Sequence, residues 1–489
     1  MSSGPLGPFG SMFPELLAVS LTALYALCQA ALATYAGHRW PMLRSRAAKP
    51  LLTPPDPLPP GGEPSVLVQL PVRDEVEVVG RLLEAAASLD WPRDRLEIQL
   101  LDDSGEAAAA LGRAAVDAAR ARGVNAMHVR RGTREGFKAG ALAHGSRASR
   151  AEFVAVFDAD FVPSPDFLRR MLPGFADPGV GMVQARWGHL NRDESLLTRA
   201  QAAMLDAHFL VEHPWRAATG RFLNFNGTAG VWRRACIESA GGWSHDTLTE
   251  DLDLSYRAQL AGWRFAYAPA VVVPAELPGS MDALKTQQHR WAKGAIQTAR
   301  KVLRGVFATS LPRRVRTEAV LHLTANASYP LLLLLATLLV PILAGAAVLP
   351  VPWALALHAG LIVAGTLPVA AFLWLGARRA GRGRGQAAVD ALAALVLCAG
   401  LSWQLTRAVW EGLVGEAGEF VRTPKQGALA GRTARTRTRV APAEWLLAAG
   451  SLAALTWALA QGAPGAMPFY ATLALGLGWV ASGARGWAR

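Results

Sequence analysis

Two aspartates, one residue apart, follow a short apolar run near the middle of the chain. The run is Phe153–Phe157, and the acids are Asp158 and Asp160. An apolar run of this length is typical of a buried strand, and parallel sheets bind ligands at the carboxyl ends of their strands. Carboxylate oxygens suit Mg2+ or Mn2+, and such an ion would hold a diphosphate. Taken alone, so short a pattern is more often an acidic turn, so its weight depends on the rest of the chain.

Two other predicted strands also end in acidic residues. The first, Ser65–Pro71, leads into Asp74 and Glu75, and the second, Leu96–Leu101, leads into Asp103. Because the carboxyl ends of neighbouring parallel strands meet at one edge of a sheet, these acids predict a single crevice. The sequence contains neither a glycine-rich dinucleotide fingerprint nor a P-loop, which argues against a dinucleotide-dependent oxidoreductase and an ATP hydrolase.

Two further groups could take part in chemistry at this crevice. Lys138, at the start of a predicted helix, is placed to meet a phosphate together with the helix amides, although a solvated surface lysine is an equal alternative. Thr249 is a predicted helix N-cap, with Glu250 and Asp251 in the first turn. If that helix begins at the crevice, one of its acids is a general base that takes a proton from an acceptor hydroxyl.

The elements that must position these residues alternate along the chain. Helices are predicted at Val76–Leu89, Ala107–Arg122 and Lys138–Ala148, and a further strand at Ala126–Val129. Strands that alternate with helices at this spacing predict an α/β domain built on a parallel, doubly wound sheet.

Apolar segments that could cross a bilayer flank this domain on both sides. They are Leu16–Ala36, Tyr329–Leu349, Trp353–Ala377, Trp445–Leu459 and Met467–Ala484. The chain has 489 residues, of which 52% are hydrophobic and 18% charged, and the excess of apolar residues belongs to these segments. We therefore expect a soluble domain inserted between transmembrane helices.

The net charge of +13 lies largely beside the apolar segments. Basic residues follow the first segment, at 38–49, and precede the last pair, at 432–439, which indicates cytoplasmic flanks under the positive-inside rule. The charge is not interleaved with an aromatic platform, so nucleic acid is not expected as a partner. The three cysteines, Cys28, Cys236 and Cys398, are far apart in sequence, which argues against a disulfide framework and fits a reducing compartment.

Two segments near the membrane helices need separate interpretation. Gln287, Arg290 and Trp291 open a basic, amphipathic segment that is expected to lie at the membrane surface. The apolar run Ala391–Leu401 has basic clusters on both sides and is shorter than the roughly 20 residues that a span needs. We expect it to lie at the interface, so that five segments cross and the residues after it stay on the same side as the α/β domain.

Four motifs, in this order and between membrane helices, resemble those of family 2 glycosyltransferases of the cellulose synthase superfamily. They are Asp103, Asp158-Ala159-Asp160, Thr249-Glu250-Asp251 and Gln287-x-x-Arg290-Trp291. The resemblance is strongest to the cellulose-synthase-like (gluco)mannan and glucan synthases, and it covers residues 65–304 and 419–425. It implies a Rossmann-like, nucleotide-sugar-binding domain of the GT-A type, inverting transfer and a divalent metal.

The resemblance also implies a role for each matching residue. Donor contacts are implied for Asp74, Glu75, Asp103, Lys138 and Asp158, and a Mg2+ or Mn2+ site for Asp158 and Asp160. Catalytic roles are implied for Asp251 as the base, Glu250 beside it and Arg290 at the leaving diphosphate; acceptor contacts are implied for Trp291, Gln287 and Thr249. A gating loop is implied at Phe420, Arg422, Thr423 and Lys425. The first motif reads Arg73-Asp74-Glu75 instead of the usual Tyr-Asn-Glu type, which leaves the base and ribose contacts open.

These implications predict a membrane-embedded inverting hexosyltransferase. It would polymerise a β-linked mannan, glucomannan or glucan from GDP-mannose or UDP-glucose onto a growing glycan and translocate the product, with its catalytic domain in the cytoplasm and its helices in the inner or plasma membrane. Single transfer to a lipid acceptor is the alternative within this class, and a catalytically silent scaffold or transporter is the alternative outside it. The predicted organisation is an anchor (1–40), a linker (41–62), a catalytic domain (63–280), an interface segment (281–316), a helix pair (317–377), an interface helix with the gating loop (378–441) and a last helix pair (442–489).

Overall fold

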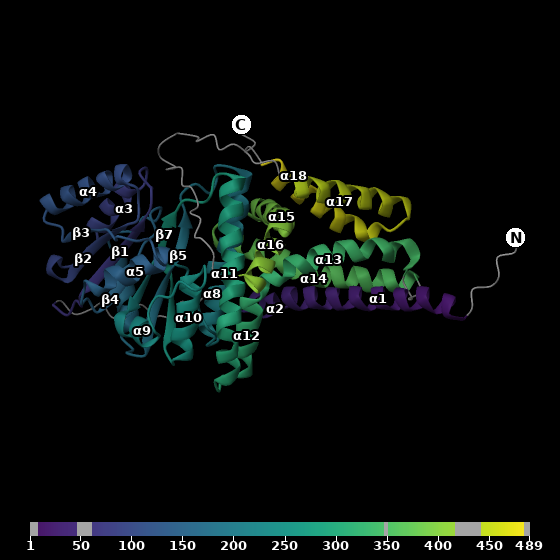
Figure 1. Cartoon of the computed structure of the whole chain (residues 1–489), viewed down its shortest axis with the longest axis horizontal. Coiled ribbons are helices and arrows are strands. Elements are labelled where there is room, and N and C mark those ends of the chain that lie inside the picture. Colours follow the sequence, from purple (N-terminus) through teal and green to yellow (C-terminus); the bar gives the residue numbers. More distant parts are fainter. Residues whose placement is uncertain (1–7, 46–60, 347–350, 416–441, 484–489) are drawn as a thin grey trace.

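The computed structural model describes residues 8–45, 61–346, 351–415 and 442–483. An α/β domain occupies one end of the molecule, and long helices from both ends of the sequence occupy the other (Figure 1). This arrangement confirms the predicted fold class, in which an α/β domain is inserted between apolar helices.

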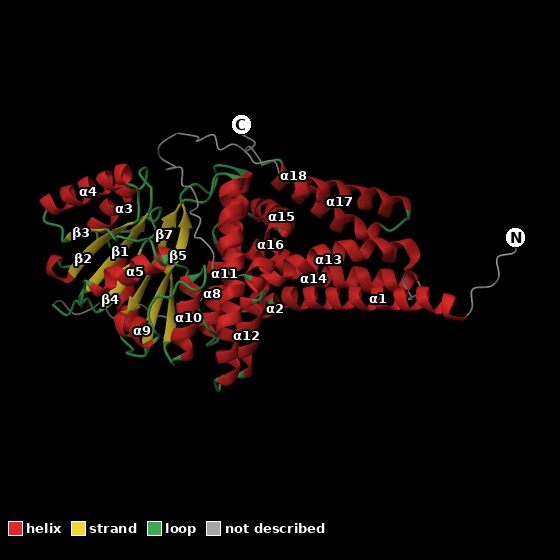
Figure 2. Ribbon diagram, viewed as in Figure 1, coloured by secondary structure: helices red, strands yellow, loops and turns green. Residues whose placement is uncertain are grey.

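A seven-stranded sheet in the order β3-β2-β1-β4-β6-β5-β7 forms the centre of the α/β domain (Figure 2). The strands are β1 (Val66–Val72), β2 (Leu96–Asp102), β3 (Ala126–Val129), β4 (Phe153–Val156), β5 (Val180–His189), β6 (Gly230–Arg233) and β7 (Arg264–Ala275). β1 pairs in parallel with β2 on one side and with β4 on the other. The carboxyl ends of these three strands therefore share one edge of the sheet.

The prediction of an entirely parallel sheet is wrong at β6. This strand is antiparallel to both of its neighbours, β4 and β5. Gly230, the first residue of β6, pairs with Val156 at the end of β4, so the turn before β6 lies at the same edge as Asp158. An apolar run shows where a strand is but not its direction, and here the chain enters the sheet from the edge where β4 leaves it.

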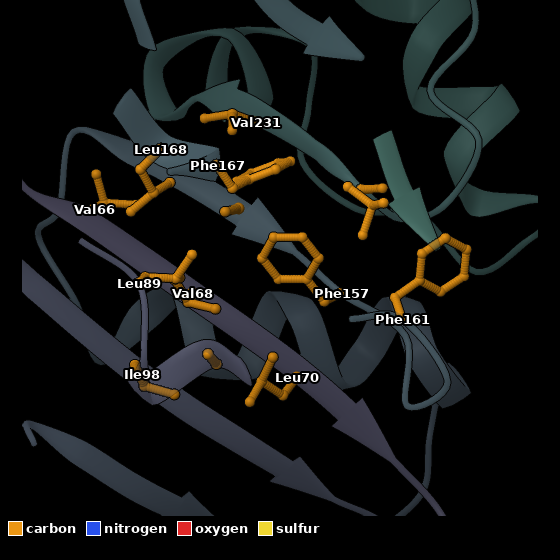
Figure 3. Packing of buried hydrophobic residues seen from close by; sticks show 14 of the residues in the cluster. Val66, Val68, Leu70, Leu89, Ile98, Phe157, Phe161, Phe167, Leu168 and Val231 are labelled. Atoms are coloured by element: carbon orange, nitrogen blue, oxygen red, sulfur yellow. The ribbon is translucent and has the colours of Figure 1, made fainter. Parts of the chain in front are cut away.

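Alternate side chains of the strands pack against helices on the two faces of the sheet. Val66, Val68 and Leu70 of β1 point to one face, where they form a continuous core (Figure 3). The helices on that face are α3 (Val79–Ala87), α4 (Glu106–Ala121) and α6 (Phe167–Met171). Leu67 of β1 points to the other face, which is covered by α5 (Phe137–Arg147), α9 (Arg234–Ser239) and α10 (Glu250–Leu260). Burial on both faces explains why the central strands are uninterrupted apolar runs.

The remaining α-helices lie beside the α/β domain or form the apolar part of the molecule. They are α1 (Pro8–Gly37), α2 (Arg39–Arg44), α7 (Leu196–Ala207), α8 (His213–Ala218), α11 (Met281–Ala308), α12 (Arg313–Leu323), α13 (Ser328–Pro341), α14 (Val351–Arg379), α15 (Arg384–Gly400), α16 (Ser402–Val414), α17 (Pro442–Ala460) and α18 (Met467–Ala481). α11 carries the predicted interface segment, but Ala292, Gly294 and Ile296 in its middle are buried by protein. Much of this helix is thus packed inside the molecule.

Among the described residues, three helical stretches are long and apolar enough to cross a membrane. They are Leu16–Arg44, Ala325–Ala344 and Pro442–Ala460, and each overlaps a predicted span. α14 covers the predicted span Trp353–Ala377, and α18 is a shorter apolar helix within the predicted span Met467–Ala484. The pair α15–α16, which contains the run Ala391–Leu401, is bent by 54° and is compatible with either a broken span or a re-entrant segment.

Both ends of the α15–α16 pair are attached to helices of the α/β side. At the start of α15, the buried Asp390 accepts hydrogen bonds from Arg199 of α7 (2.8 Å from Nε) and Arg382 (3.1 Å). At the end of α16, Arg300 of α11 donates to the carbonyls of Gly412 and Gly415, at 3.1 and 3.2 Å. The start of α15 and the end of α16 therefore both lie beside helices that pack against the α/β domain, α7 and α11.

The Asp390 cluster gives a prediction about stability. Replacing Asp390 by Asn keeps the shape but leaves two guanidinium groups without their buried counter-charge, and disrupting such a pair costs about 3–5 kcal/mol. We expect a clear drop in the thermal unfolding midpoint of the purified protein in detergent. Asp94→Asn is the matched control, because the Asp94 side chain is 81% exposed and its contact with Arg95 is 3.7 Å long. Equal unfolding midpoints for the two variants would contradict the prediction.

A second buried cluster joins the first apolar helix to the α/β domain. Glu318 of α12, only 3% exposed, lies 2.7 Å from Nε2 of His38 at the end of α1. Its other oxygen accepts a hydrogen bond from Nε of Arg216 in α8 at 2.9 Å. One carboxylate thus connects α1, α8 and α12.

Candidate active site

A pocket opens at the sheet edge where β1, β2 and β4 end. Residues that follow the carboxyl ends of these strands line it, together with residues at the ends of β5 and β7. The first turns of α5 and α10 and the first half of α11 complete its walls. The three acidic strand ends and the later motifs therefore meet around one space, as the sequence predicts.

Most of the predicted site residues line this pocket. They are Glu75, Asp103, Lys138, Asp158, Asp160, Glu250, Asp251, Gln287, Arg290 and Trp291. Asp74 and Thr249 are not among the described residues that line it. The predicted gating residues Phe420, Arg422, Thr423 and Lys425 lie outside the described residues.

Asp74 and Thr249 have local partners instead. Asp74 has a positive φ of 51°, and its Oδ1 accepts a hydrogen bond of 2.9 Å from the backbone of Gly105. Thr249 precedes α10, as predicted, but its hydroxyl does not cap the helix and lies 3.2 Å from the hydroxyl of Thr298 on α11. Gly294 of α11 permits this close approach, because a Cβ there would lie 2.5 Å from Thr249 Cγ2. Both residues therefore contact segments beside the pocket.

Lys138 is the central cation of the pocket. Its ammonium donates hydrogen bonds to Asp158 (2.6 Å) and to the carbonyl of Gly227 (2.8 Å), and it lies 3.7 Å from Glu250. Burial alone would lower the pKa of Lys138, but the charges of Asp158 and Glu250 outweigh it and raise that pKa. The lysine therefore stays protonated between the strand-end acids and the acids of α10, and the alternative of a solvated surface lysine is excluded.

Asp251 has a pKa well above the usual range of an aspartate. Its burial, together with the charge of Glu250, raises the pKa of Asp251 to about 7, although Lys138 pulls it down. Oδ1 accepts a hydrogen bond from the backbone of Leu252 at 2.8 Å. Oδ2 faces Gly227, where an added Cβ would lie 2.8 Å away. Since the φ of Gly227 is also positive, at +82°, glycine is required for this approach to the acid.

Asp103, at the end of β2, is held by an arginine that sequence reasoning missed. Arg131 donates to both carboxylate oxygens, from Nε at 2.9 Å and from Nη2 at 2.5 Å. The same guanidinium donates to the carbonyls of Glu135 and Phe137. This two-pronged contact fixes the direction in which the carboxylate faces the pocket. Local sequence does not show the pairing, because the two residues lie on neighbouring strand ends.

An aromatic wall forms another side of the pocket. Trp187 of β5 packs against Phe161, at a ring-centroid distance of 5.1 Å, and against Phe209, at 5.2 Å. Trp291 of α11 lies 6.5 Å from Trp187. The predicted Trp291 is thus part of a cluster rather than a single ring, and the two tryptophans, whose planes are tilted by 53°, give the pocket an apolar wall.

Several other lining residues were also missed. They are Arg134, His189, Asn226 and Glu276. Glu276 directly follows β7, so the rule that selected acids at strand ends would have found it if β7 had been recognised. Asn226 lies in the turn before β6, and its amide is fixed by contacts with His213 (2.9 Å) and His208 (3.0 Å).

The acids after β4 fit a divalent cation only together with a ligand. Asp160 is 3% exposed, Asp158 is partly exposed, and both line the pocket. Within the described residues, no group of three or more His, Cys, Asp or Glu side chains is arranged to hold a metal. Two carboxylates suffice for an ion whose remaining ligands come from substrate phosphates and water. The donor set therefore suits Mg2+ or Mn2+ bound with a diphosphate.

The chain is similar in sequence to a family of known proteins over the region that contains these motifs. Residues 64–294 match the model of glycosyltransferase-like family 2. Glucomannan 4-beta-mannosyltransferase 2 of Arabidopsis thaliana is 46% identical over 246 residues, which are 49% of this chain and 46% of that protein. Probable glucomannan 4-beta-mannosyltransferase 7 of Oryza sativa subsp. japonica is 40% identical over 302 residues, 58% of this chain and 52% of that protein. The chain thus spans about half the length of the curated relatives it matches.

Comparison with solved structures finds a mannosyltransferase of similar extent. It is PcManGT from Pyrobaculum calidifontis, solved in complex with GDP-Man and Mn2+. The two chains are 22% identical, with a TM-score of 0.49, and the match covers 82% of this chain and 99% of the other.

Proposed function

We propose that this protein is a membrane-embedded, inverting hexosyltransferase, and the match of residues 64–294 to the model of glycosyltransferase-like family 2 supports the proposal. The protein extends a β-linked hexose polysaccharide from a nucleotide sugar. One observation carries the proposal: a raised-pKa acid, Asp251, shares a pocket with the cations Lys138 and Arg290 and with the aromatic surface of Trp187 and Trp291. These are the groups that direct displacement of a diphosphate by a sugar hydroxyl requires.

On the donor side, the protein binds and neutralises the diphosphate. Lys138 and Arg290 supply positive charge where negative charge develops as the sugar–phosphate bond breaks. Asp103, held by Arg131, faces the nucleotide. The ammonium of Lys138 already lies beside Asp158, so a donor held at that acid meets the cation without a large rearrangement.

On the acceptor side, the protein positions a hydroxyl and removes its proton. The sugar at the end of the growing glycan packs against Trp291, with Trp187 beside it. Asp251 accepts the proton of the attacking hydroxyl, and its pKa of about 7 matches that task at neutral pH. A single displacement with no enzyme nucleophile inverts the configuration at the sugar carbon, so an α-linked donor gives a β-linked product.

Asp158 and Asp160 would hold a divalent cation together with the donor diphosphate. When bound, that cation supplies Lewis-acid stabilisation of the leaving group. Lys138 and Arg290 add to this positive charge from the protein itself.

The sugar is proposed to be mannose, glucose or both. The glucomannan 4-beta-mannosyltransferases named above support mannosyl transfer over the matched half of the chain. The test is to incubate the purified full chain with labelled GDP-mannose or UDP-glucose and to digest the product with a mannanase or a glucanase. A polymer that one of these hydrolases degrades supports the proposal. Label that extracts into organic solvent indicates single transfer to a lipid, and no release of nucleoside diphosphate from either donor indicates a silent scaffold.

We further propose that five segments cross the membrane and that the α15–α16 pair enters and leaves on the catalytic side. The attachments of Asp390 to α7 and of Arg300 to the end of α16 support this topology. Single cysteines at Gly385 and Val414, in a variant without the three native cysteines, should both react with an impermeant thiol reagent in inside-out vesicles. If Val414→Cys reacts only after the vesicles are opened, the pair crosses and the chain has a sixth span.

Export of the product through the same chain remains part of the proposal. Four polar residues precede the Tyr329 segment: His322, Thr324, Asn326 and Ser328. Three of them have internal partners, because His322 lies 2.9 Å from the hydroxyl of Tyr256, Thr324 lies 2.9 Å from that of Tyr35, and Ser328 donates a 2.7 Å hydrogen bond to the carbonyl of Ala325. The position of Trp291 at the pocket, on a helix that leads towards α13, is the remaining support. Polymer made by sealed inside-out vesicles should resist added hydrolase until detergent is present. Polymer that is digested at once would indicate release on the catalytic side.

A further inference from the structure

The hairpin formed by the end of α11 and the start of α12 has an unusual charge distribution. Residues 283–317 contain no acid, and they contain nine basic residues: Lys285, Arg290, Lys293, Arg300, Lys301, Arg304, Arg313, Arg314 and Arg316. Some of these cations have acidic partners on other elements. Lys285 pairs with Glu444, Lys293 with Glu411, and Lys301 with Asp246 and Asp253.

Three arginines at the tip of the hairpin differ from the others. Arg304, Arg313 and Arg314 are exposed, and none of them forms an ion pair with another described residue. Phe307 lies between them in sequence and is 58% exposed. The α11–α12 tip, defined as these four residues, therefore presents three arginines without an acidic partner among the described residues and one exposed aromatic ring.

The fold places this tip at the level where the first apolar helix ends. Glu318 and Thr324 of the α12 region contact His38 and Tyr35 at the end of α1. Arg313 and Arg314 precede Glu318 by four or five residues, which is about 7 Å along a helix axis. α11 itself runs across the direction of α1, α13 and α14, and the hairpin, at one end of these helices, extends sideways past α1 (Figure 1).

We propose that the α11–α12 tip binds the headgroups of anionic phospholipids in the bilayer that surrounds the apolar helices. The inference rests on the proposed membrane insertion but not on the proposed chemistry. Arginines within a Debye length of an anionic surface, about 8 Å at physiological salt, are attracted to it. Each such arginine contributes roughly a fivefold factor in affinity, so three contribute about 100-fold. An aromatic ring beside them suits the boundary between headgroups and acyl chains.

The tip also has a mechanical consequence for the pocket. α11 carries Gln287, Arg290 and Trp291 in its first half and Phe307 near its end. A tip that is bound to headgroups fixes the far end of the helix whose near end lines the pocket. Anionic lipid would therefore hold the acceptor wall at a constant height above the membrane.

The experiment places an environment-sensitive fluorophore next to the tip. Ala308, exposed and adjacent to Phe307, is replaced by Cys in the full chain lacking its native cysteines, and the labelled protein is reconstituted in nanodiscs. We expect a blue-shifted emission, shielded from an aqueous quencher, in phosphatidylcholine discs that contain phosphatidylglycerol and not in discs of phosphatidylcholine alone. High salt should reverse the shift. Ala110→Cys on α4, also exposed and far from the apolar helices, is the matched control and should not respond.

Substitutions at the three arginines separate charge from folding. The triple variant R304Q/R313Q/R314Q should lose the response to phosphatidylglycerol, whereas R304K/R313K/R314K should keep most of it. A second triple variant, R95Q/R113Q/R120Q, makes the same charge change on the far side of the α/β domain and should behave as the parent. Identical spectra in the two lipid compositions, or a full response in the glutamine variant, would overturn the proposal. Because the readout is fluorescence, these outcomes do not depend on whether the protein transfers sugar.

Discussion

Asp251→Asn should reduce the turnover of hexose transfer by roughly 10²–10⁴-fold, which is the contribution of a positioned general base. The amide oxygen can still accept the 2.8 Å hydrogen bond from Leu252, and the side chain keeps its size beside Gly227. Donor affinity should therefore change little, because the substitution removes only the capacity to take the proton. Steady-state turnover and donor binding, measured on the same preparation, give the two values.

The pH dependence of turnover provides a second readout of the same acid. A base is active when deprotonated, and the pKa of the proposed base Asp251 is raised to about 7, so turnover should rise with pH through about 7 and then level off. Glu250 is one cause of that raised pKa, so Glu250→Gln should move the midpoint of the profile to lower pH. If the midpoint of the pH profile is the same in Glu250→Gln as in the parent, a group other than Asp251 limits the rate.

The control for Asp251 comes from the same segment. Asp246→Asn changes an acid that is outside the pocket lining, is 57% exposed and pairs with Lys301. It should retain nearly all activity. Near-normal turnover in Asp251→Asn, or an equal loss in both variants, would remove Asp251 as the base.

Removal of divalent metal should reduce transfer by roughly 10²-fold or more, because Lewis-acid stabilisation of a leaving group contributes several kcal/mol. Activity of EDTA-treated enzyme should return with Mn2+ or Mg2+. Asp160→Asn should weaken Mn2+ binding to the complex of enzyme and nucleoside diphosphate, since it removes a buried carboxylate from a donor set of two.

The metal prediction has a binding control as well as an activity control. Asp166→Asn alters a nearby acid that pairs with Arg170 outside the pocket, and it should leave the Mn2+ affinity unchanged. Titration followed by electron paramagnetic resonance of free Mn2+ measures this affinity without turnover. If the metal-free enzyme is fully active, the proposed cation site is wrong. Asp158 and Asp160 would then have a structural role only, which for Asp158 includes its pairing with Lys138.

Sequence reasoning predicted the residues that lie in the pocket better than the contacts between them. Asp103, Asp158 and Asp251 could be found because their positions follow local rules: acids after an apolar run, or in the first turn of a helix. Arg131 could not be found, because its partnership with Asp103 depends on which strand ends are neighbours in the sheet. Trp187 was missed for the same reason, since its contact with Trp291 joins residues about a hundred positions apart.

For the fold, the positions of most strands could be predicted from the sequence, but their pairing could not be predicted in full. Strands β1 to β4 were expected within one or two residues of their observed bounds, because each is a short apolar run with polar ends. The direction of β6 was not predictable, because the sequence of this four-residue strand does not indicate at which edge of the sheet the chain enters it. The two hydroxyls of Thr249 and Thr298 show a further limit: Thr249 occupies the cap position, but a helix packed against it takes its hydrogen bond.

The carboxylate of Glu318, shared by α1, α8 and α12, bears on how a polymerising enzyme could advance its product. Rocking of the catalytic domain on its anchor would pull Arg216 or His38 away from that buried charge, and such separations are strongly unfavourable. The α/β domain and the apolar helix α1 should therefore keep a fixed position relative to each other. In the proposed polymerisation, each added sugar would then be accommodated by sliding of the glycan past a stationary Trp291, and the length of each step would be set by the product and not by a movement of the protein.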